Sequence, residues 1–512
     1  MVGLPDTFNA ATWFVDRNVD EGRGAKVAIE CGDQCITYAQ LLDHVNRAGN
    51  LLRTDFDARI EERVALLLLD GPEFIYSFFG AMKIGAVPVP LSTLWKPHEY
   101  EYALNDCRAR VLVVSDALKA QIESIPRERL RHLRHVITAS DLPARLANAS
   151  PTLAAEPTSK DDPAFWLYSS GSTGSPKGCV HLHHDMVVCT DLYAKGVLAM
   201  TPGDRCFSVA KLFFAYGLGN AMYCPFGVGA TTILWPGSPA AANVYAMIEK
   251  HRPTLFFSVP TNYGMLLAHT REERDFDLSS IRYAVSAGES LPAALFERFK
   301  QRFGVEILDG IGSTEILHIF ISNRPGAIRA GSSGQIVAGY QARIVDEENR
   351  DVADGEIGNL LIRGDSTCAA YWNKHEKTKG TIEGHWIRTG DKYRRDAEGY
   401  YWYAGRSDDM LKVGGIWVSP VEIENALIEH DAVLECGVGA RPDHDGLLKP
   451  YAFVVLRPGF AGTPELAAEL QQFARSKLAD YKRPRWVAFI AELPKTATGK
   501  LQRYKLREKA AQ

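Results

Sequence analysis

Apolar runs that alternate with helical stretches constrain the fold of this chain more than any other feature. Val64-Ala-Leu-Leu-Leu-Leu69 precedes a helix-like segment through Phe74 and Phe78, and further apolar runs follow at 86–91 and 110–114. Runs that are apolar at every position predict strands covered on both faces, as in βαβ units. The predicted fold class is therefore α/β.

The pattern changes twice along the chain. After about residue 330, Gly- and Asp-rich turns separate short alternating strands such as Gly358–Arg363, which predicts a β-rich lobe. Ser419-Pro-Val-Glu422 has the pattern of a capping box with proline at the first helical position, so a helix of a separate unit is expected there. We expect a large N-terminal domain at 1–406 and a small α+β C-terminal domain at 407–512.

A glycine- and hydroxyl-rich loop, Tyr168-Ser-Ser-Gly-Ser-Thr-Gly-Ser-Pro-Lys-Gly178, directly follows the apolar run Ala164-Phe-Trp-Leu167. Such a loop offers backbone N–H groups, hydroxyls and one cation, which together suit a polyphosphate. It is not a Walker A loop, because Pro176 precedes Lys177 and no Gly-Lys-Ser/Thr follows. Proline also biases Ser175 away from the helical region, so we do not expect the loop to lead straight into a helix. Taken alone, a solvated Gly/Ser linker explains this loop equally well.

Bulk properties exclude several classes of partner. The chain has 512 residues, a formal net charge of −4 and no long run of Lys or Arg, which argues against a nucleic-acid or anionic-membrane surface. No apolar run approaches the length needed to span a bilayer, and the segment Met1–Thr7 carries an acid and a proline in place of a basic leader. We expect a cytoplasmic enzyme acting on small molecules.

Cysteine and histidine usage gives no metal site. The nine cysteines include no C-x-x-C pair, so we expect reduced thiols. The cluster His181-Leu-His-His-Asp185 is too crowded for a typical metal site, and we interpret it as the start of a helix near the loop.

The loop and four later segments resemble, in order, the motifs of the acyl-adenylate-forming superfamily of acyl-CoA synthetases, adenylation domains and luciferases. Gly312-Ser-Thr-Glu315 resembles its second nucleotide motif and Trp386-Ile-Arg-Thr-Gly-Asp391 its ribose motif. Gly405-Arg-Ser-Asp-Asp-Met-Leu-Lys412 resembles its interdomain hinge, and Pro494-Lys-Thr-Ala-Thr-Gly-Lys500 its C-terminal lysine loop. The resemblance spans nearly the whole chain and implies the adenylate-forming enzyme fold, with ATP, Mg²⁺ and coenzyme A as cofactors.

The resemblance also assigns roles to residues. It implies that Lys177 contacts the β,γ-phosphates, that Thr314 lies beside the α-phosphate, and that Lys500 contacts the reacting oxygens during adenylation. Asp391 would bind the ribose hydroxyls, since a carboxylate accepts hydrogen bonds from both, with Arg406 nearby. Nucleotide contacts are also implied for Ser169, Ser170, Gly171, Ser172, Thr173, Gly174, Gly288, Glu289, Asp309, Gly310 and Ile311, and Thr173 and Glu315 would hold the metal.

Thioester formation is implied to use a second pose of the C-terminal domain. Asp408 corresponds to the hinge of the family, and a few backbone dihedrals there can absorb a rotation. In the second pose the catalytic loop would be Lys412-Val-Gly-Gly415, where Gly414 permits close approach of a pantetheine arm.

Two segments indicate which class of carboxylic acid the protein would bind. Phe213-Phe-Ala-Tyr-Gly-Leu-Gly-Asn220 and Gly312-Ser-Thr-Glu-Ile-Leu-His-Ile319 resemble segments that line the acid pocket of benzoate–CoA ligases. A flat, mostly apolar slot suits a planar aromatic carboxylic acid, whereas a long acyl chain needs a tunnel. The resemblance does not decide between benzoate and its hydroxy, amino and fluoro derivatives as the preferred substrate. Phe213 can equally be a core-packing residue. The slot residues implied are Phe214, Ala215, Tyr216, Gly312, His318 and Ile319.

Three other functions fit some of these motifs. An enzyme that loads an aryl acid onto a carrier protein would share them, and so would a luciferase-type oxygenase. A nucleotide sensor without catalysis is the third, which the joint presence of Lys500, Glu315 and Asp391 disfavours. A homodimer is a further expectation.

Overall fold

The computed structural model describes residues 3–169, 175–271, 275–407, 409–413, 416–444, 447–495 and 501–511. The predicted site residues Ser170 to Gly174, Asp408, Gly414 and Lys500 lie outside these ranges, as does the side chain of Lys412.

The first α/β unit is a four-stranded parallel sheet in the order β4-β3-β5-β6. Alternate residues of one strand enter two different cores. Val64 and Leu66 pack on the side of α1 and α2, while Ala65 and Leu67 pack on the side of α3 and α4. This two-sided burial explains why the strand is apolar at every position. The elements are β3 (Arg63–Leu67), β4 (Val87–Pro90), β5 (Val111–Val114), β6 (His135–Thr138), α1 (Tyr38–Thr54), α2 (Pro72–Lys83), α3 (Pro97–Asp106), α4 (Asp116–Glu123) and α5 (Leu142–Asn148).

The second sheet has nine strands in the order β15-β14-β13-β12-β11-β9-β10-β1-β2, and those from β13 to β1 run parallel. Helices α9 to α11 pack on one face, and α6 to α8 on the other. The predicted α/β class is confirmed. The strands are β1 (Val27–Cys31), β2 (Gln34–Thr37), β9 (Arg205–Ser208), β10 (Thr231–Leu234), β11 (Leu255–Ser258), β12 (Tyr283–Ser286), β13 (Ile307–Gly312), β14 (Ile319–Ser322) and β15 (Gln335–Ile336). The helices are α6 (Asp185–Cys189), α7 (Ala215–Leu218), α8 (Cys224–Val228), α9 (Ala241–His251), α10 (Pro260–Ala268) and α11 (Ala293–Phe303).

The predicted phosphate loop lies between two antiparallel strands, β7 (Pro163–Ser169) and β8 (Lys177–Leu182). No helix follows the loop directly, as the proline before Lys177 predicts. The short strand β18 (Ala370–Tyr371) pairs with β8 and brings a distant segment beside the loop.

The expected β-rich lobe is a five-stranded sheet in which β16, β17, β20 and β19 are neighbours and β21 pairs with β20. A small helix, α12, lies in the same part of the chain. These elements are β16 (Gln341–Val345), β17 (Gly358–Arg363), β19 (Ile382–Glu383), β20 (Trp386–Arg395), β21 (Tyr401–Arg406) and α12 (His375–Lys379).

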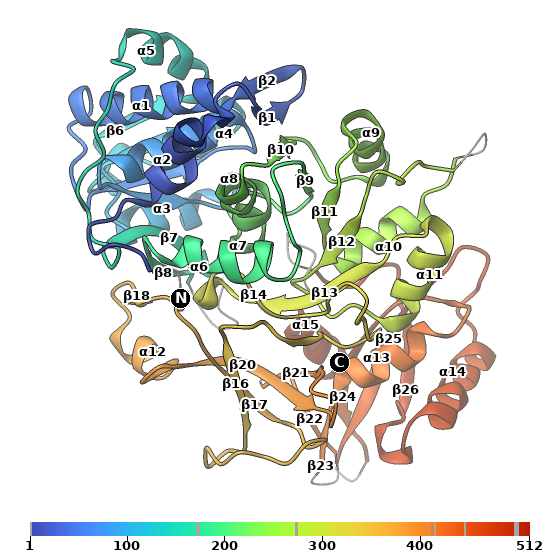
Figure 1. Ribbon diagram of the computed structural model, residues 1–512. Coiled ribbons are helices and arrows are strands. Elements are labelled where there is room, and N and C mark those ends of the chain that lie inside the picture. Colours follow the sequence, from blue (N-terminus) through green and yellow to red (C-terminus); the bar gives the residue numbers. More distant parts are fainter. Residues whose placement is uncertain are drawn as a thin grey trace.

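The C-terminal unit packs an antiparallel β24-β25 pair and the parallel strand β26 against helices, with a separate β22-β23 hairpin. Its helices α13 and α14 and strands β24 to β26 form the darker orange to red part at the lower right of Figure 1. The predicted capping box is only half formed. Ser419 accepts from the backbone N–H of Glu422, whereas the Glu422 carboxylate turns to Lys482, 2.6 Å away. The elements are β22 (Leu411–Val413), β23 (Ile416–Val418), β24 (Val433–Pro442), β25 (Leu448–Leu456), β26 (Trp486–Phe489), α13 (Pro420–Ile428), α14 (Pro464–Lys477) and α15 (Arg503–Ala511).

Candidate active site

One turn joins the two predicted halves of the site. Strand β13 ends at Gly312, a single 3₁₀ turn spans Thr314–Ile316, and the chain returns antiparallel as β14, with Gly312 opposite Ile319. Thr314 and Glu315 of the nucleotide motif therefore lie three to five residues from His318 and Ile319 of the acid motif. Gly312 has no room for a Cβ, which would lie 2.7 Å from the carbonyl oxygen of His318.

Glu315 is held at the end of the phosphate loop. Its Oε1 accepts hydrogen bonds from Ser169 Oγ at 3.0 Å and from Tyr371 Oη at 2.8 Å. Burial alone would raise the pKa of Glu315, but the Tyr371 hydrogen bond, a backbone hydrogen bond, the charge of Lys177 and the Ser169 hydrogen bond together hold the pKa below its ordinary value. The carboxylate is thus kept charged in a partly enclosed place.

Lys177 begins β8 directly after the loop. Its Nζ lies over the ring of Tyr371, 4.8 Å from the ring centre. Burial lowers the pKa of Lys177, while the nearby Glu315 opposes that shift. Lys177, Glu315 and Tyr371 therefore form one cluster beside the position of the loop.

Gly288 and Glu289 follow the carboxyl end of β12, and Asp309 forms the last parallel pair between β12 and its neighbour β13, at the edge where α/β sheets bind ligands. Gly288 has φ +91°, a conformation that favours glycine, and Glu289 accepts hydrogen bonds from Thr261 N and Oγ1. Asp309 is buried, which raises its pKa well above the ordinary value. Gly310 and Ile311 continue β13 toward the turn.

Asp391 and Arg406 meet across the lobe sheet. They are opposite each other in the β20-β21 register, and Arg406 Nη1 lies 3.1 Å from Asp391 Oδ1. Asp391 is buried, whereas the Arg406 side chain is exposed. Two residues that the family resemblance implied to lie together are thus paired by strand register.

Two residues of the segment 213–220 lie beside His318, whose Nε2 is 3.1 Å from Asn220 Oδ1. The Tyr216 and His318 rings are 6.1 Å apart, and Tyr216 Oη donates to the carbonyl oxygen of Val285 at the end of β12. Phe214 precedes α7 and Ala215 begins it. His318 is buried, and a side chain at Gly219 would collide with it. Burial lowers the pKa of His318 to about 3, so the imidazole is neutral.

Phe213 and Phe214 differ in exposure. The side chain of Phe213 is buried, and its ring centre is 4.2 Å from that of the more exposed Phe214. The ring of Phe213 therefore packs in the interior and supports Phe214.

Sequence reasoning missed Tyr371, because the segment Ala369–Trp372 has no feature that points to a nucleotide. Only the pairing of β18 with β8 brings its hydroxyl to Glu315. The interpretation of His181 to Asp185 was partly wrong, because His181 belongs to β8 and only Asp185 begins the helix α6. Within the described residues, no group of three or more His, Cys, Asp or Glu is placed to hold a metal ion, and all nine cysteines are free.

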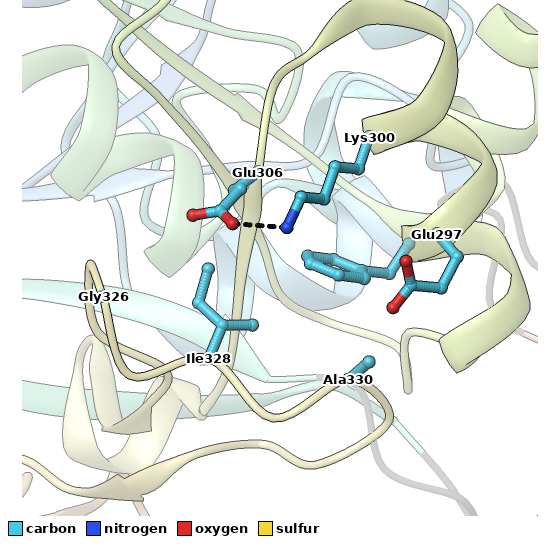
Figure 2. A pocket seen from close by; sticks show the side chains of 7 residues that line it. Glu297, Lys300, Glu306, Gly326, Ile328 and Ala330 are labelled. Carbon is cyan, nitrogen blue, oxygen red and sulfur yellow. Dashed lines mark hydrogen bonds and ion pairs between the residues drawn. The ribbon is translucent and has the colours of Figure 1, made fainter.

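A surface hollow of about 250 Å³ lies elsewhere, beside α11 (Figure 2). Phe296 and Ile328 line it, and its Lys300 is 2.8 Å from Glu306. None of the predicted site residues within the described ranges lines this hollow, so we do not assign it to the active site.

The sequence model described as AMP-binding enzyme matches residues 15–372, and that described as AMP-binding enzyme C-terminal domain matches residues 422–500. The chain belongs to the AMP-binding enzyme family.

Individual relatives match almost the whole chain. A benzoate–CoA ligase of Thauera aromatica is 46% identical over 512 residues, covering 99% of this chain and 97% of the relative. The crystal structure of the anthranilate CoA ligase AuaEII in complex with anthranoyl-AMP superimposes with a TM-score of 0.95 at 46% identity, covering 99% of this chain and 98% of that one. A benzoate CoA ligase from Burkholderia xenovorans LB400 gives a TM-score of 0.90 at 44% identity, with 98% and 100% covered. Among the helices described, none is long and apolar enough to cross a membrane.

Proposed function

We propose that this protein is an ATP-dependent aryl-CoA ligase, an AMP-forming acid–thiol ligase that converts benzoate or a substituted benzoate to its adenylate and then to the thioester. The observation that carries the proposal is the single turn from Gly312 to Ile319, which bears a held carboxylate on one side and a buried neutral His318 on the other. Near-complete coverage of aryl-CoA ligases at 46% identity supports it.

ATP supplies the activation. A carboxylate oxygen of the acid attacks the α-phosphorus, the bond to the bridging oxygen breaks, and pyrophosphate leaves. The thiol of coenzyme A then attacks the acyl carbon, the bond to AMP breaks, and the thiol proton is lost to solvent. No protein nucleophile is needed, so charge stabilisation and positioning provide the catalysis.

The residues of this chain take separate parts in adenylation. Lys177 would neutralise the β,γ-phosphates, and Thr314 would contact the α-phosphate. Asp391 would accept from the ribose hydroxyls, with its carboxylate oriented by Arg406 at 3.1 Å. Lys500 of the C-terminal domain would stabilise the charge that develops on the reacting oxygens. Ser169, Ser170, Gly171, Ser172, Thr173 and Gly174 would wrap the phosphates.

Glu315 fits a magnesium ligand. Carboxylate oxygens are the ligands that Mg²⁺ prefers, and both described hydrogen bonds of Glu315 go to Oε1. Mg²⁺ would neutralise phosphate charge when bound, with Thr173 as a second ligand. Among the described residues, Ser169 and Tyr371 fix the carboxylate and keep it ionised.

Thioester formation is proposed to follow a rotation at Asp408, so that 1–406 is the fixed domain and 407–512 the moving one. The helix α13 packs against β21 at this boundary, and the side chain of Asp409 lies 3.7 Å from Arg503. Lys412 and Gly414 would then face the thiol arm. The nine free cysteines suit the reducing cytoplasm, where ATP and coenzyme A are available.

A screen of pyrophosphate release over benzoate and its hydroxy, amino and fluoro derivatives, with and without coenzyme A, tests the function. We expect release with at least one aryl acid and AMP formation that accelerates with coenzyme A. Acceleration by a carrier protein in place of coenzyme A would favour the loading enzyme. Absence of acid-dependent release with every derivative would contradict the proposal and revive the nucleotide sensor.

A further inference from the structure

The turn that joins the two halves of the site is strained. Leu317 is buried and has φ +71° and ψ −43°, a conformation that a bulky L-residue rarely adopts. Such a conformation persists only where the surroundings fix it. The groups that hold this turn therefore determine where Thr314, Glu315 and His318 lie.

Three consecutive carbonyl groups of the turn each accept a hydrogen bond from a different residue outside it. Cys368 N donates to the Glu315 oxygen at 2.7 Å, and Ser366 Oγ donates to the Ile316 oxygen at 2.9 Å. The third donor is the imidazole of His181, whose Nε2 lies 2.7 Å from the carbonyl oxygen of Thr314. Since a carbonyl oxygen only accepts, Nε2 must donate in this contact.

The His181 ring is itself oriented by a contact on its other nitrogen. Its Nδ1 lies 2.7 Å from Asp185 Oδ2, and the same carboxylate oxygen accepts from Leu182 N at 3.1 Å. Both side chains are fully buried. A carboxyl group on one ring nitrogen fixes the direction in which the other nitrogen points.

We infer that His181, oriented by Asp185, is a positioning residue that fixes the Thr314 backbone and so aligns the nucleotide side of the turn with the acid side. This inference rests on the proposed aryl-CoA ligase function. His181 does not act on the substrates itself, because its two ring nitrogens are already occupied by Asp185 and Thr314.

A packing role is the competing explanation, because the His181 ring also stacks on Phe165, with ring centres 5.2 Å apart and an angle of 17° between the planes. Two substitutions separate the roles. His181→Phe keeps the stacked ring and removes the donor, whereas His181→Gln removes the ring and keeps an N–H donor at similar reach.

Single-turnover adenylation with the acid selected by the screen, together with the KM for ATP and the melting temperature, would test the inference. We expect His181→Phe to slow adenylation by roughly 10- to 100-fold, since a small displacement of a positioning group costs about that much. The KM for ATP should change little, because alignment in the transition state is lost and binding of the ground state is retained. His181→Gln should keep most of the wild-type rate.

His183→Phe is the matched control. His183 is also buried and lies two residues away, but its Nδ1 accepts from Ala10 N at 3.1 Å and does not contact the turn. This variant should lose thermal stability while keeping the adenylation rate of the folded enzyme.

The comparison of adenylation rates between His181→Phe and His181→Gln decides the inference. Equal rates for His181→Phe and His181→Gln, or a slower His181→Gln, would overturn it. If His181→Phe does not fold, His181→Leu replaces it with the same expectation. A wild-type enzyme inactive with all aryl acids would instead contradict the proposed function, so the two failures are distinguishable.

Discussion

The proposed nucleotide side and the proposed acid side of the site lie three residues apart on one turn, yet one holds a charged side chain and the other a neutral one. Glu315 is partly enclosed, and burial raises its pKa, but hydrogen bonds from Tyr371, the backbone and Ser169 together with the charge of Lys177 bring the pKa below its ordinary value. Among the residues that the structure describes, His318 has no comparable charged partner, and burial lowers its pKa to about 3. One side therefore keeps a charge by surrounding it with partners, and the other removes a charge by burial.

This difference matches the two substrates that the proposal assigns. Phosphates need fixed charges and donors, whereas a ring needs an apolar slot in which a charge would be costly. The short turn between the two sides would hold the nucleotide and the acid in a fixed relative position. If the two sides are independent, a change on one side should leave the other side unaffected.

Removal of the cation proposed at the reacting oxygens should have the largest effect. Lys500→Ala should slow adenylation by roughly 10²- to 10³-fold, the scale for losing one preorganised electrostatic donor. Conversion of a pre-made benzoyl-adenylate with coenzyme A should persist, and the KM for benzoate should be almost unchanged. Single-turnover assays of the two half-reactions measure both. Equal loss in both half-reactions would remove Lys500 from its assigned role.

A larger side chain in the proposed acid slot tests the acid side of the site. Ala215 is buried at the start of α7, so Ala215→Leu should lower kcat/KM for benzoate by about 10- to 100-fold through overpacking. The KM for ATP should stay close to wild type. Steady-state kinetics with each substrate varied in turn give both constants. A collapse of ATP affinity with unchanged acid selectivity would place Ala215 outside the slot.

Loss of the Tyr371 hydroxyl should give an intermediate effect on the nucleotide side alone. Tyr371→Phe removes one hydrogen bond to a charged group, which should slow adenylation about tenfold. Because that bond lowers the pKa of Glu315, its loss should raise the pKa and move the acidic limb of the pH–rate profile to higher pH. Lys177→Gln is a useful comparison, since it should move the limb in the same direction. If the acidic limb of the pH–rate profile is unshifted in Tyr371→Phe, the ionisation of Glu315 does not determine the position of that limb.

The smallest expected effect is that of pH on kcat/KM for benzoate through His318. With a pKa of about 3, His318 stays neutral between about pH 5 and pH 9, so kcat/KM for benzoate should show no step from this group. His318→Asn should alter the preference among ring substituents and leave the pH profile in place. A step near neutral pH that disappears in His318→Asn would show that the ring titrates and that the acid side also carries charge.

Much of the site was predictable from sequence because its segments are local. The family resemblance assigned Gly288, Asp309 and Gly310 to the nucleotide site, and in the structure they lie on or just after the neighbouring strands β12 and β13. The order of the motifs predicted the fold class and the family, and both are confirmed. The strand–loop–strand path around Lys177 was also predictable in part, because Pro176 forbids a direct helix. The helix at Ser419 was predicted, but its cap is half of the expected box.

Only the tertiary structure decided which groups hold those residues. Glu315 and Ser169 are 146 residues apart, and His181 and Thr314 are 133 apart, so no local pattern relates them. Tyr371 reaches Glu315 because β18 pairs with β8, and such pairing depends on how separate sheets pack. The sequence by itself determined which chemical groups are present and the strand ends that carry several of them. The charge of Glu315, the neutrality of His318 and the fixed turn between them arise from burial and long-range hydrogen bonds, which exist only in the folded chain.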